Sequence, residues 1–418
     1  MAAVPDGATV AVTGASGFIG SHVVEAVLRA GFAVRAVVRD PSNAAKTAHL
    51  EAIAKDYDAA LTFARGDLGV DGSFDAAFAG ADAVVHVAAV VEVTGSSDAA
   101  AAIIAPSVDG CRNVLASVRR SGTVKKFVHT SSCIAVAAVD TKGGGDKFYD
   151  EGDFNEWSTA ASDPYGYAKT AAEALVRETC AELDIPLATL NPGVTLGPCF
   201  TKQHTKASTV LLRELLYGNP LLNYNCTFVD VRDVADAHAR ALRTDVTGRF
   251  LCVNDDGVRN TLDLGAYARA ACPQWRTDAT PMYSPNFLAA ARALYNVPYV
   301  GPAACGLAGV TDFKLRACED RIPFANGRAK ETLGVAFRPL TDTVRDGLAS
   351  IVDGGWVTPR APETLPPPGK PSTRPQRPPR FLGGSECSLL NGARSNQKAA
   401  NQMRRAPGKK PLLHTGAP

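Results

Sequence analysis

Apolar and polar residues alternate near the start of the chain in an order that predicts a strand, a helix and a second strand. Residues 9–12 are apolar or β-branched, which is typical of a short buried strand. Residues 21–30 place apolar side chains at helical spacing, and Gly31 follows them as a helix stop. Residues 33–38 have the pattern of another buried strand. This order within about thirty residues predicts a βαβ unit.

The segment between the first strand and the helix is rich in glycine and has the sequence TGASGFIG, residues 13–20. Gly14 permits a tight turn, Gly17 lets the backbone approach a pyrophosphate, and Gly20 lets the helix pack closely on the strand. The helix N-terminus offers free N–H groups and a positive dipole end to phosphates. A plain turn is the alternative, but the βαβ context favours a dinucleotide-binding site.

The end of the second predicted strand indicates which dinucleotide is bound. An acidic residue there would bind the ribose 2′-hydroxyl of NAD, whereas an arginine would accommodate the 2′-phosphate of NADP. Arg39 occupies this end, and Lys46 follows within the next helical segment. A guanidinium group matches a phosphate well, so NADP(H) is the expected cofactor. In the alternative, Arg39 is solvated and Asp40 binds the ribose of NAD.

Further strand patterns alternate with helical ones and predict an α/β fold, a doubly wound parallel (Rossmann) sheet with a smaller C-terminal substrate-binding lobe and a disordered tail. The expected strands are residues 61–64, 83–87, 126–130, 185–190, 228–232 and 250–253. We expect residues 1–193 to form the cofactor-binding domain that also carries the catalytic residues. Residues 194–357 would form mainly the substrate-binding lobe and return some strands to the main sheet, and residues 358–418 would be the tail.

A tyrosine and a lysine are predicted to share one face of a helix over residues 164–183. Asp163 is a good N-cap and Pro164 a good first helical residue, and Tyr165 and Lys169 are four positions apart. Reduction of a carbonyl needs a hydride on carbon and a proton on oxygen. A phenol has a pKa of about 10, and a nearby ammonium lowers it towards working pH. The alternative is an exposed tyrosine beside a solvated lysine.

Together these motifs resemble the extended short-chain dehydrogenase/reductase superfamily, in the branch with an NAD-dependent epimerase/dehydratase-type domain that contains dihydroflavonol 4-reductase and cinnamoyl-CoA reductase. The resemblance implies an NADP-dependent oxidoreductase that reduces a ketone or aldehyde on a small organic molecule. By this resemblance Tyr165 donates the proton, Lys169 supports it, and Ser132 binds the substrate oxygen. The matching segments are TGASGFIG, RDP at 39–41, GDL at 66–68, HVAA at 86–89, TSS at 130–132, YGYAK at 165–169, NPG at 191–193 and FVDVRDVA at 228–235.

Cofactor contacts are expected from the glycine-rich turn, the strand ends and the catalytic helix. The resemblance places GDL beside the adenine and the Pro-Gly of NPG at the nicotinamide end, and small residues after the 83–87 strand let the backbone approach the cofactor. We expect no metal. The expected cofactor-binding residues are Gly14, Gly17, Phe18, Ile19, Gly20, Arg39, Lys46, Asp67, Leu68, Val87, Ala88, Ala89, Tyr165, Lys169, Pro192, Gly193 and Val194.

Three other functions stay open at this point. Residues 326–334 resemble the C-terminal part of 3β-hydroxysteroid and sterol dehydrogenases, and a sugar-nucleotide epimerase is a further enzymatic alternative. Arg39 favours NADP and so argues against the mainly NAD-using options. A non-enzymatic NADP-sensing regulator is expected to lose the tyrosine or the lysine, and both are present.

Composition changes this interpretation only at the C-terminal end. With 44 basic and 42 acidic residues the formal net charge is +2, which argues against a general nucleic-acid binder. Residues 359–418 hold 11 basic and 2 acidic residues and are rich in proline, so they are expected to be a disordered tail with at most a weak interaction role. The 10 cysteines form no C-x-x-C pair, and no long apolar run predicts a transmembrane segment. Only about eight residues precede the first apolar run, which argues against a signal peptide. We therefore expect a cytoplasmic enzyme.

Overall fold

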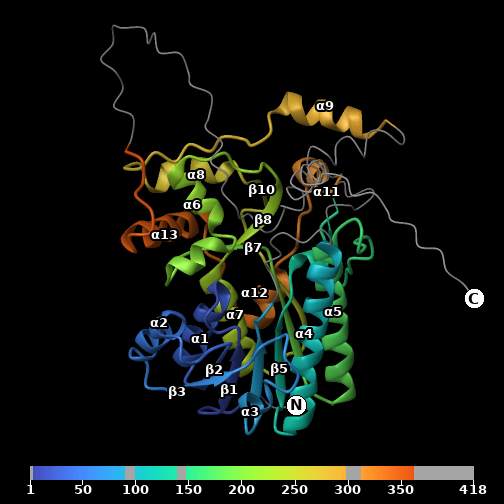
Figure 1. The fold of residues 1–418 in the computed structure, drawn as a ribbon, viewed down its shortest axis with the longest axis vertical. Coiled ribbons are helices and arrows are strands. Elements are labelled where there is room, and N and C mark those ends of the chain that lie inside the picture. The colour runs from blue at the N-terminus through green and yellow to red at the C-terminus, as the bar shows by residue number, and fades with distance from the viewer. Residues whose placement is uncertain (1–2, 90–98, 139–146, 298–311, 362–418) are drawn as a thin grey trace, which may run out of the picture.

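The computed structural model describes residues 3–89, 99–138, 147–297 and 312–361. Figure 1 shows a lower part built around a large sheet and an upper part built around a small one. The predicted tail beyond residue 361 and most of the glycine-rich loop at 140–150 lie outside the described residues.

The large sheet has seven strands in the order β3-β2-β1-β4-β5-β6-β9, all of them parallel. β1 lies between β2 and β4, with Val10 opposite Val34 on one side and Ala83 on the other, so the order reverses here. The predicted doubly wound α/β fold is confirmed. The strands are β1 (Thr9–Thr13), β2 (Ala33–Val38), β3 (Leu61–Arg65), β4 (Ala83–His86), β5 (Lys126–Thr130), β6 (Leu187–Pro192) and β9 (Gly248–Cys252).

Helices cover both faces of this sheet because its strands are apolar on both sides. Val10 and Val12 pack against α1 (Phe18–Arg29), α2 (Ala44–Ala54), α7 (Val231–Arg243) and α12 (Gly327–Leu333). Ala11, which points to the opposite face, packs against α3 (Asp75–Phe78), α4 (Ala99–Ser121) and α5 (Pro164–Glu182).

A smaller sheet forms the core of the upper part, in the order β10-β8-β7. Its strands are β7 (Val194–Leu196), β8 (Asn225–Asp230) and β10 (Val258–Asn260), and α6 (Val210–Tyr217), α8 (Asp263–Ala271) and α13 (Leu340–Asp353) pack around it. Of the two segments expected to return to the main sheet, only β9 does so. The predicted strand at 228–232 instead ends at Asp230, because the side chain of Asp230 accepts a hydrogen bond from the Arg232 amide and caps α7.

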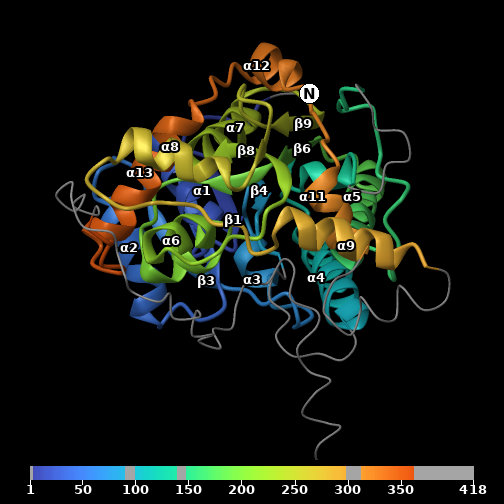
Figure 2. The same cartoon turned by 90° about the horizontal axis from the view of Figure 1, so that it is seen from above.

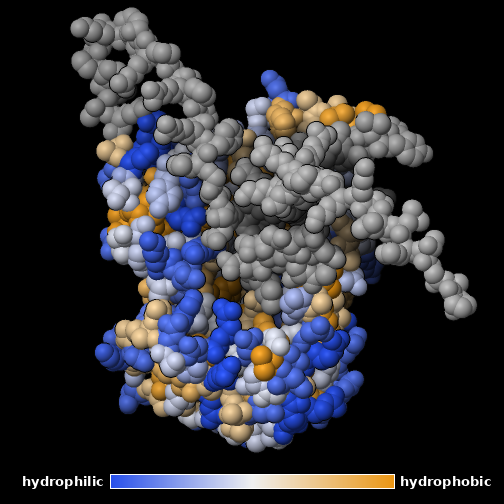
Figure 3. All heavy atoms as spheres, viewed as in Figure 1, coloured by the Kyte–Doolittle hydropathy of each residue, from blue (hydrophilic) through white to orange (hydrophobic). Residues whose placement is uncertain are grey.

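Two further helices lie at the top of the molecule (Figures 1 and 2). α9 (Pro285–Tyr295) packs on α11 (Asp312–Glu319) through Ala291 and Leu315. Figure 3 shows an apolar patch over α9, where Phe287 is 41% and Leu294 43% exposed. In the described part of the chain, no helix combines the length and apolar character needed to cross a membrane.

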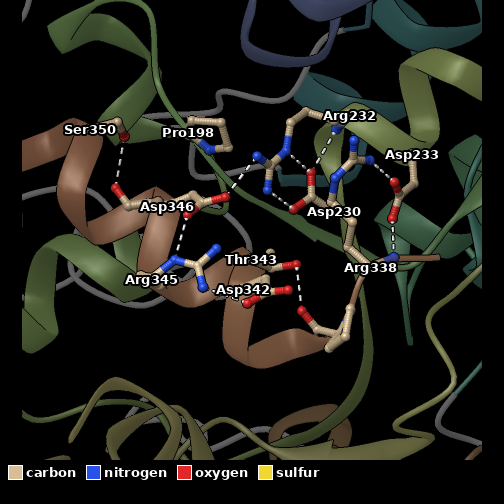
Figure 4. A network of polar contacts seen from close by, with 12 residues as sticks. Pro198, Asp230, Arg232, Asp233, Arg338, Asp342, Thr343, Arg345, Asp346 and Ser350 are labelled. Carbon is tan, nitrogen blue, oxygen red and sulfur yellow. Dashed lines mark hydrogen bonds and ion pairs between the residues drawn. The ribbon is translucent and has the colours of Figure 1, made fainter. Parts of the chain in front are cut away.

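Charged side chains join the two parts of the molecule at the start of α7 (Figure 4). The buried carboxylate of Asp230 accepts two hydrogen bonds from the guanidinium of Arg232, at 2.9 and 2.7 Å. The same guanidinium reaches Asp346 on α13 at 2.7 Å. Nearby, Asp233 of α7 pairs with Arg338, which precedes α13. This network holds α13 of the upper part against α7 of the lower part.

We expect Asp230→Ala to lower the free energy of unfolding by about 3 kcal/mol, because the variant loses both the buried ion pair with Arg232 and the N-cap of α7. Asp342→Ala is the matched control, because that carboxylate pairs with Arg345 at the surface and is 42% exposed. The control should lose less than about 1 kcal/mol. Urea unfolding of both variants measures the difference, and equal losses would contradict the role given to Asp230.

Candidate active site

The glycine-rich turn after β1 has room for no side chain at two positions, Gly14 and Gly20. Gly14 has φ +67°, and a Cβ there would lie 2.8 Å from the Cα of Ala88. A Cβ on Gly20 would overlap the carbonyl oxygen of Gly14. Gly17 caps α1 and donates its N–H to the Gly14 carbonyl at 2.9 Å. The turn therefore brings the N-terminus of α1 close to the end of β4, as a dinucleotide-binding turn requires.

Thr13, which the sequence analysis did not single out, fixes the ends of β1 and β4 against each other. Its buried hydroxyl accepts the N–H groups of Val87 and Ala88, both at 3.2 Å, and lies 2.8 Å from Nδ1 of His86. Because both amides donate to the hydroxyl, the hydroxyl donates to Nδ1, and Nε2 of His86 faces the Cys111 thiol at 3.5 Å. Burial lowers the pKa of His86 to about 3. His86 is therefore neutral and structural.

At the end of β2, Arg39 is exposed to solvent, whereas the neighbouring Asp40 is hydrogen-bonded within its own turn. The carboxylate of Asp40 accepts hydrogen bonds from the amide and hydroxyl of Ser42, at 3.0 and 2.6 Å, and these bonds lower its pKa. Arg39 is exposed, and Lys46 lies on the first turns of α2. The cationic residues therefore border the position expected for the adenosine ribose, while Asp40 is engaged in its own turn.

Other predicted cofactor-binding residues lie at the carboxyl ends of β3, β4 and β6. Asp67 accepts the Gly69 amide at 2.9 Å, and the carbonyl of Leu68 accepts the side-chain amide of Asn113 at 2.8 Å. Gly193 donates its N–H to Cys252 at 3.0 Å, and a Cβ there would lie 2.6 Å from the Thr227 carbonyl oxygen. The remaining predicted residues at these ends are Val87, Ala88, Ala89, Pro192 and Val194. Phe18 and Ile19 open α1 and pack into the core of the small sheet.

Two of the three predicted catalytic residues meet at the end of β5. Ser132 follows β5 and caps the short 3₁₀ turn Cys133–Ala135. Burial raises the pKa of the Tyr165 phenol to about 12, with a smaller contribution from Cys133, and hydrogen bonding to Ser132 opposes this. The phenol therefore lies near Ser132 and is protonated near neutral pH. The lowered pKa expected from the sequence is wrong, because burial raises the pKa of this phenol and the Lys169 ammonium does not counteract it.

Lys169, the third predicted residue, lies one turn further along α5 on the same face. Burial lowers the pKa of its ammonium, and Cys111 and Glu173 act in the opposite direction. Burial lowers the pKa values of His86 and His129, and the positive charge of Lys169 lowers them further. The structure thus brings Tyr165 near Ser132, whereas the groups that favour the charged form of Lys169 are Cys111 and Glu173.

A chain of polar side chains, also missed by the sequence analysis, connects the Ser132 turn to the start of α5. The side-chain amide of Asn155 donates to the Ile134 carbonyl at 2.8 Å and to the Ser158 hydroxyl at 2.7 Å. Ser158 donates to Asp163 at 2.7 Å, and Asp163 caps α5 by accepting the Gly166 amide at 3.0 Å. This chain holds the first turn of α5, and with it Tyr165, at a fixed distance from the Ser132 turn.

Comparison with known proteins identifies the family at this point. The model of the NAD dependent epimerase/dehydratase family matches residues 10–252, which include β1 to β9, the glycine-rich turn and the whole of α5. The chain belongs to this family.

Relatives within the family are named as reductases. The chain is 30% identical over 283 residues to dihydroflavonol 4-reductase of Arabidopsis thaliana, covering 65% of this chain and 72% of that protein. It is also 30% identical over 254 residues to tetraketide alpha-pyrone reductase 2 of the same plant, covering 58% of this chain and 76% of that protein. The predicted resemblance is confirmed, and with it the prediction of an NAD(P)-dependent oxidoreductase.

Solved structures show the same fold. The NADPH complex of Gre2 from Candida albicans has a TM-score of 0.66 at 23% identity, over 83% of this chain and 99% of that one. Vestitone reductase from alfalfa has a TM-score of 0.59 at 23% identity, over 84% and 99% of the two chains.

Neither His238 nor any cysteine in the described part of the chain gives a sign of further chemistry. His238 is fully buried on α7, and its Nδ1 donates to the Val234 carbonyl while its Nε2 accepts the Thr130 hydroxyl, both at 2.7 Å. This pairing supports a structural role. Among the described residues, the cysteines are free thiols and no group of three or more His, Cys, Asp or Glu side chains could hold a metal ion.

Proposed function

We propose that this protein is an NADPH-dependent reductase that converts a ketone or aldehyde on a small organic molecule into an alcohol, with Tyr165 as the proton donor. The observation that carries the proposal is the chain of hydrogen bonds through Asn155, Ser158 and Asp163, which holds the first turn of α5 beside the turn that begins at Ser132. Both lie at the same edge of the sheet as the glycine-rich turn. A carbonyl oxygen placed between the hydroxyl groups of Tyr165 and Ser132 could accept a hydrogen bond from each.

The residues of the site fit a nicotinamide dinucleotide. Gly14 lets the turn pack closely on Ala88, and Gly20 lets α1 pack closely on the Gly14 carbonyl. The N-terminus of α1 has no side-chain cap, so its N–H groups can bind a pyrophosphate. Gly14, Gly17 and Gly20 would hold the pyrophosphate, and Gly193 would lie at the nicotinamide end. Bound NADPH would supply the hydride that reaches the carbonyl carbon.

Each catalytic side chain then has one task. Ser132 donates a hydrogen bond to the carbonyl oxygen and orients it towards Tyr165. The Tyr165 phenol transfers its proton to this oxygen as negative charge develops there, which yields the alcohol and a tyrosinate. Lys169, one turn further along α5, would hold the nicotinamide ribose with its ammonium. A proton from solvent then restores the phenol. A phenol whose pKa is raised to about 12 stays protonated at neutral pH and so has a proton to donate.

Activity is tested by following NADPH oxidation by the purified full-length chain against a panel of aromatic and aliphatic ketones and aldehydes. Dihydroflavonols and α-pyrone polyketides belong in the panel because relatives carry those names. Consumption of NADPH with stoichiometric formation of an alcohol supports the proposal. Absence of turnover across the panel, together with NAD-dependent oxidation of a sterol or epimerisation of a sugar nucleotide, would replace it with one of the alternatives.

The preference for NADP rests on Arg39 and predicts an asymmetric effect of its removal. A hydrogen bond between charged groups contributes about 1.5–3 kcal/mol, so Arg39→Ala should raise the Kd for NADPH about tenfold or more and leave that for NADH unchanged. Lys55→Ala, at an exposed position at the other end of α2, is the control. Fluorescence titration measures both, and tighter binding of NADH than of NADPH by the wild-type protein would overturn the assignment.

A further inference from the structure

A third polar residue continues the reactive face of α5. Tyr165, Lys169 and Glu173 follow one another at intervals of four, so their side chains lie on one side of the helix. Glu173 is only 4% exposed and is turned into the protein. A carboxylate that is withdrawn from water is costly unless it is paired and hydrogen-bonded. The hydrogen-bond and ion-pair partners of Glu173 therefore indicate its role.

The carboxylate of Glu173 connects α5 to the last three strands of the large sheet. Its Oε2 accepts hydrogen bonds from the Ser131 hydroxyl, after β5, and from the side-chain amide of Asn191 on β6, the latter at 2.9 Å. Its Oε1 faces Nε of Arg249, on β9, at 2.6 Å. One buried side chain thus fixes the position of α5 relative to β5, β6 and β9.

The same partners hold the turn that carries Ser132. The side-chain amide of Asn191 also donates to the carbonyl oxygen of Ser132 at 3.1 Å. The guanidinium of Arg249 donates to the carbonyl of Ala135 at 3.0 Å, at the end of the 3₁₀ turn that Ser132 begins. The hydroxyl bound by Glu173 belongs to Ser131, the immediate neighbour of Ser132. Every residue that binds the Glu173 carboxylate therefore also touches or adjoins the Ser132 turn.

Charge is arranged around the same point. Glu173 lies between two cations, Arg249 and Lys169, and it is one of the two groups that stabilise the charged form of Lys169 against burial. The other groups around Lys169 are Cys111 of α4, whose pKa burial raises to about 11, and His86 and His129, whose pKa values burial lowers. These three are neutral near pH 7, so Glu173 is the anion among them. Arg177, one turn along α5, is a further cation of this region, and its guanidinium lies over the same Phe154 ring as that of Arg249.

We propose that Glu173 is a positioning residue for carbonyl reduction: its carboxylate holds the Ser132 turn opposite Tyr165 and balances the charge of Lys169. This inference rests on the proposed function. Glu173 does not touch the reacting atoms itself; it acts through Ser131 and Asn191 on the position of Ser132, and through space on Lys169.

The two effects are separated by three substitutions. Glu173→Gln keeps the size of the side chain but removes its charge. We expect it to lower kcat about tenfold with a smaller change in KM. We also expect it to move the alkaline limb of the kcat–pH profile to lower pH, because Lys169 loses the anion that favours its charged form. Glu173→Asp keeps the charge but shortens the reach, and Ser131→Ala removes one anchor of the turn. Both should lower kcat and leave the alkaline limb in place.

The control is Glu178→Gln, an exposed glutamate on the same helix, which should change neither kcat nor the pH profile. Because Glu173→Gln leaves Arg249 buried beside a neutral partner, turnover is expressed per NADPH-binding site counted by fluorescence titration. A wild-type turnover per site and an unmoved alkaline limb in Glu173→Gln would overturn the inference. If that variant does not fold, an unchanged kcat in Glu173→Asp and Ser131→Ala overturns it instead. Absence of turnover in the wild-type protein would reject the proposed function and this inference together.

Discussion

Tyr165→Phe should lower turnover with NADPH by about 10³-fold or more while leaving the Kd for NADPH within about twofold of wild type. Removal of a positioned proton donor typically costs about 10²–10⁴ in rate. The phenylalanine ring keeps the packing of Tyr165 and removes only the hydroxyl group that lies near Ser132. Stopped-flow or steady-state oxidation of NADPH measures the rate, and fluorescence titration measures binding of the cofactor.

Tyr167→Phe is a matched control for this experiment. Tyr167 lies two residues further along α5 and is 40% exposed, so loss of its hydroxyl should leave turnover unchanged. Equal losses of turnover in both variants would mean that a disturbance of α5, and not removal of the Tyr165 hydroxyl, causes the loss. An unchanged rate in Tyr165→Phe would remove the proposed proton donor altogether.

The fold and the order of the reactive residues were predictable because they depend on local patterns. The turn at Gly14 and Gly20 has a steric requirement that only glycine meets, and the strands before and after it are short apolar runs. The helix start at Asp163 carries its own capping residue, so the phase of Tyr165 and Lys169 on α5 follows from the sequence. These features can be predicted without knowing the order of the strands in the sheet.

The second layer of the site was not predictable for the opposite reason. A glutamate at position 173 of a helix is ordinarily a solvated residue, and the sequence contains no local sign that it is buried. Its partners Ser131, Asn191 and Arg249 come together only when β5, β6 and β9 are adjacent in the sheet. The destination of β8 was missed in the same way, because β7 and β10 are three residues long and too short to show a strand period.

The contacts around Tyr165 also explain how a helix residue and a loop residue can form one site. The start of α5 is connected to the Ser132 turn through Asn155, Ser158 and Asp163. About two turns further along α5, Glu173 makes a second connection through Ser131. Hydrogen bonds thus connect α5 to the Ser132 turn both before and after Tyr165 in the sequence. A preorganised pair of hydroxyl groups reduces the reorganisation needed when charge develops on the substrate oxygen.

Buried histidines predict that the protein loses stability in mild acid, well above the pH at which carboxylates titrate. Burial lowers the pKa of His86 and His204 to about 3 and that of His238 to about 4, and that of His129 lies well below its usual range. The hydrogen bonds also favour the neutral forms. Nε2 of His238 accepts the Thr130 hydroxyl, and Nδ1 of His204 accepts the Phe200 amide at 3.3 Å, so a proton on either nitrogen would remove a bond.

The direction of the effect follows from proton binding. An unfolded histidine has a pKa of about 6.5, so between about pH 6.5 and 4 the unfolded chain binds protons that the folded protein excludes, and the free energy of unfolding falls as the pH falls. Each such histidine contributes up to about 1.4 kcal/mol per pH unit. Asp233 opposes them, because burial raises its pKa to about 6 and the folded form gains a proton in the same window. Asp163, whose pKa burial also raises, acts in the same direction as Asp233. The four histidines outnumber these two carboxyl groups, and the net loss is comparable with the stability of a typical domain, about 5–15 kcal/mol.

We therefore expect cooperative unfolding on acidification to about pH 5, and a steep decrease in the midpoint of urea unfolding between pH 7 and pH 5.5. Urea titrations followed by circular dichroism at several pH values in this range measure it. His238→Gln can keep a neutral side chain beside Thr130, so it should be less stable than wild type at pH 7.5 but show a shallower dependence on pH. A free energy of unfolding that is constant between pH 7 and pH 5 would show that these histidines are not held neutral in the folded protein.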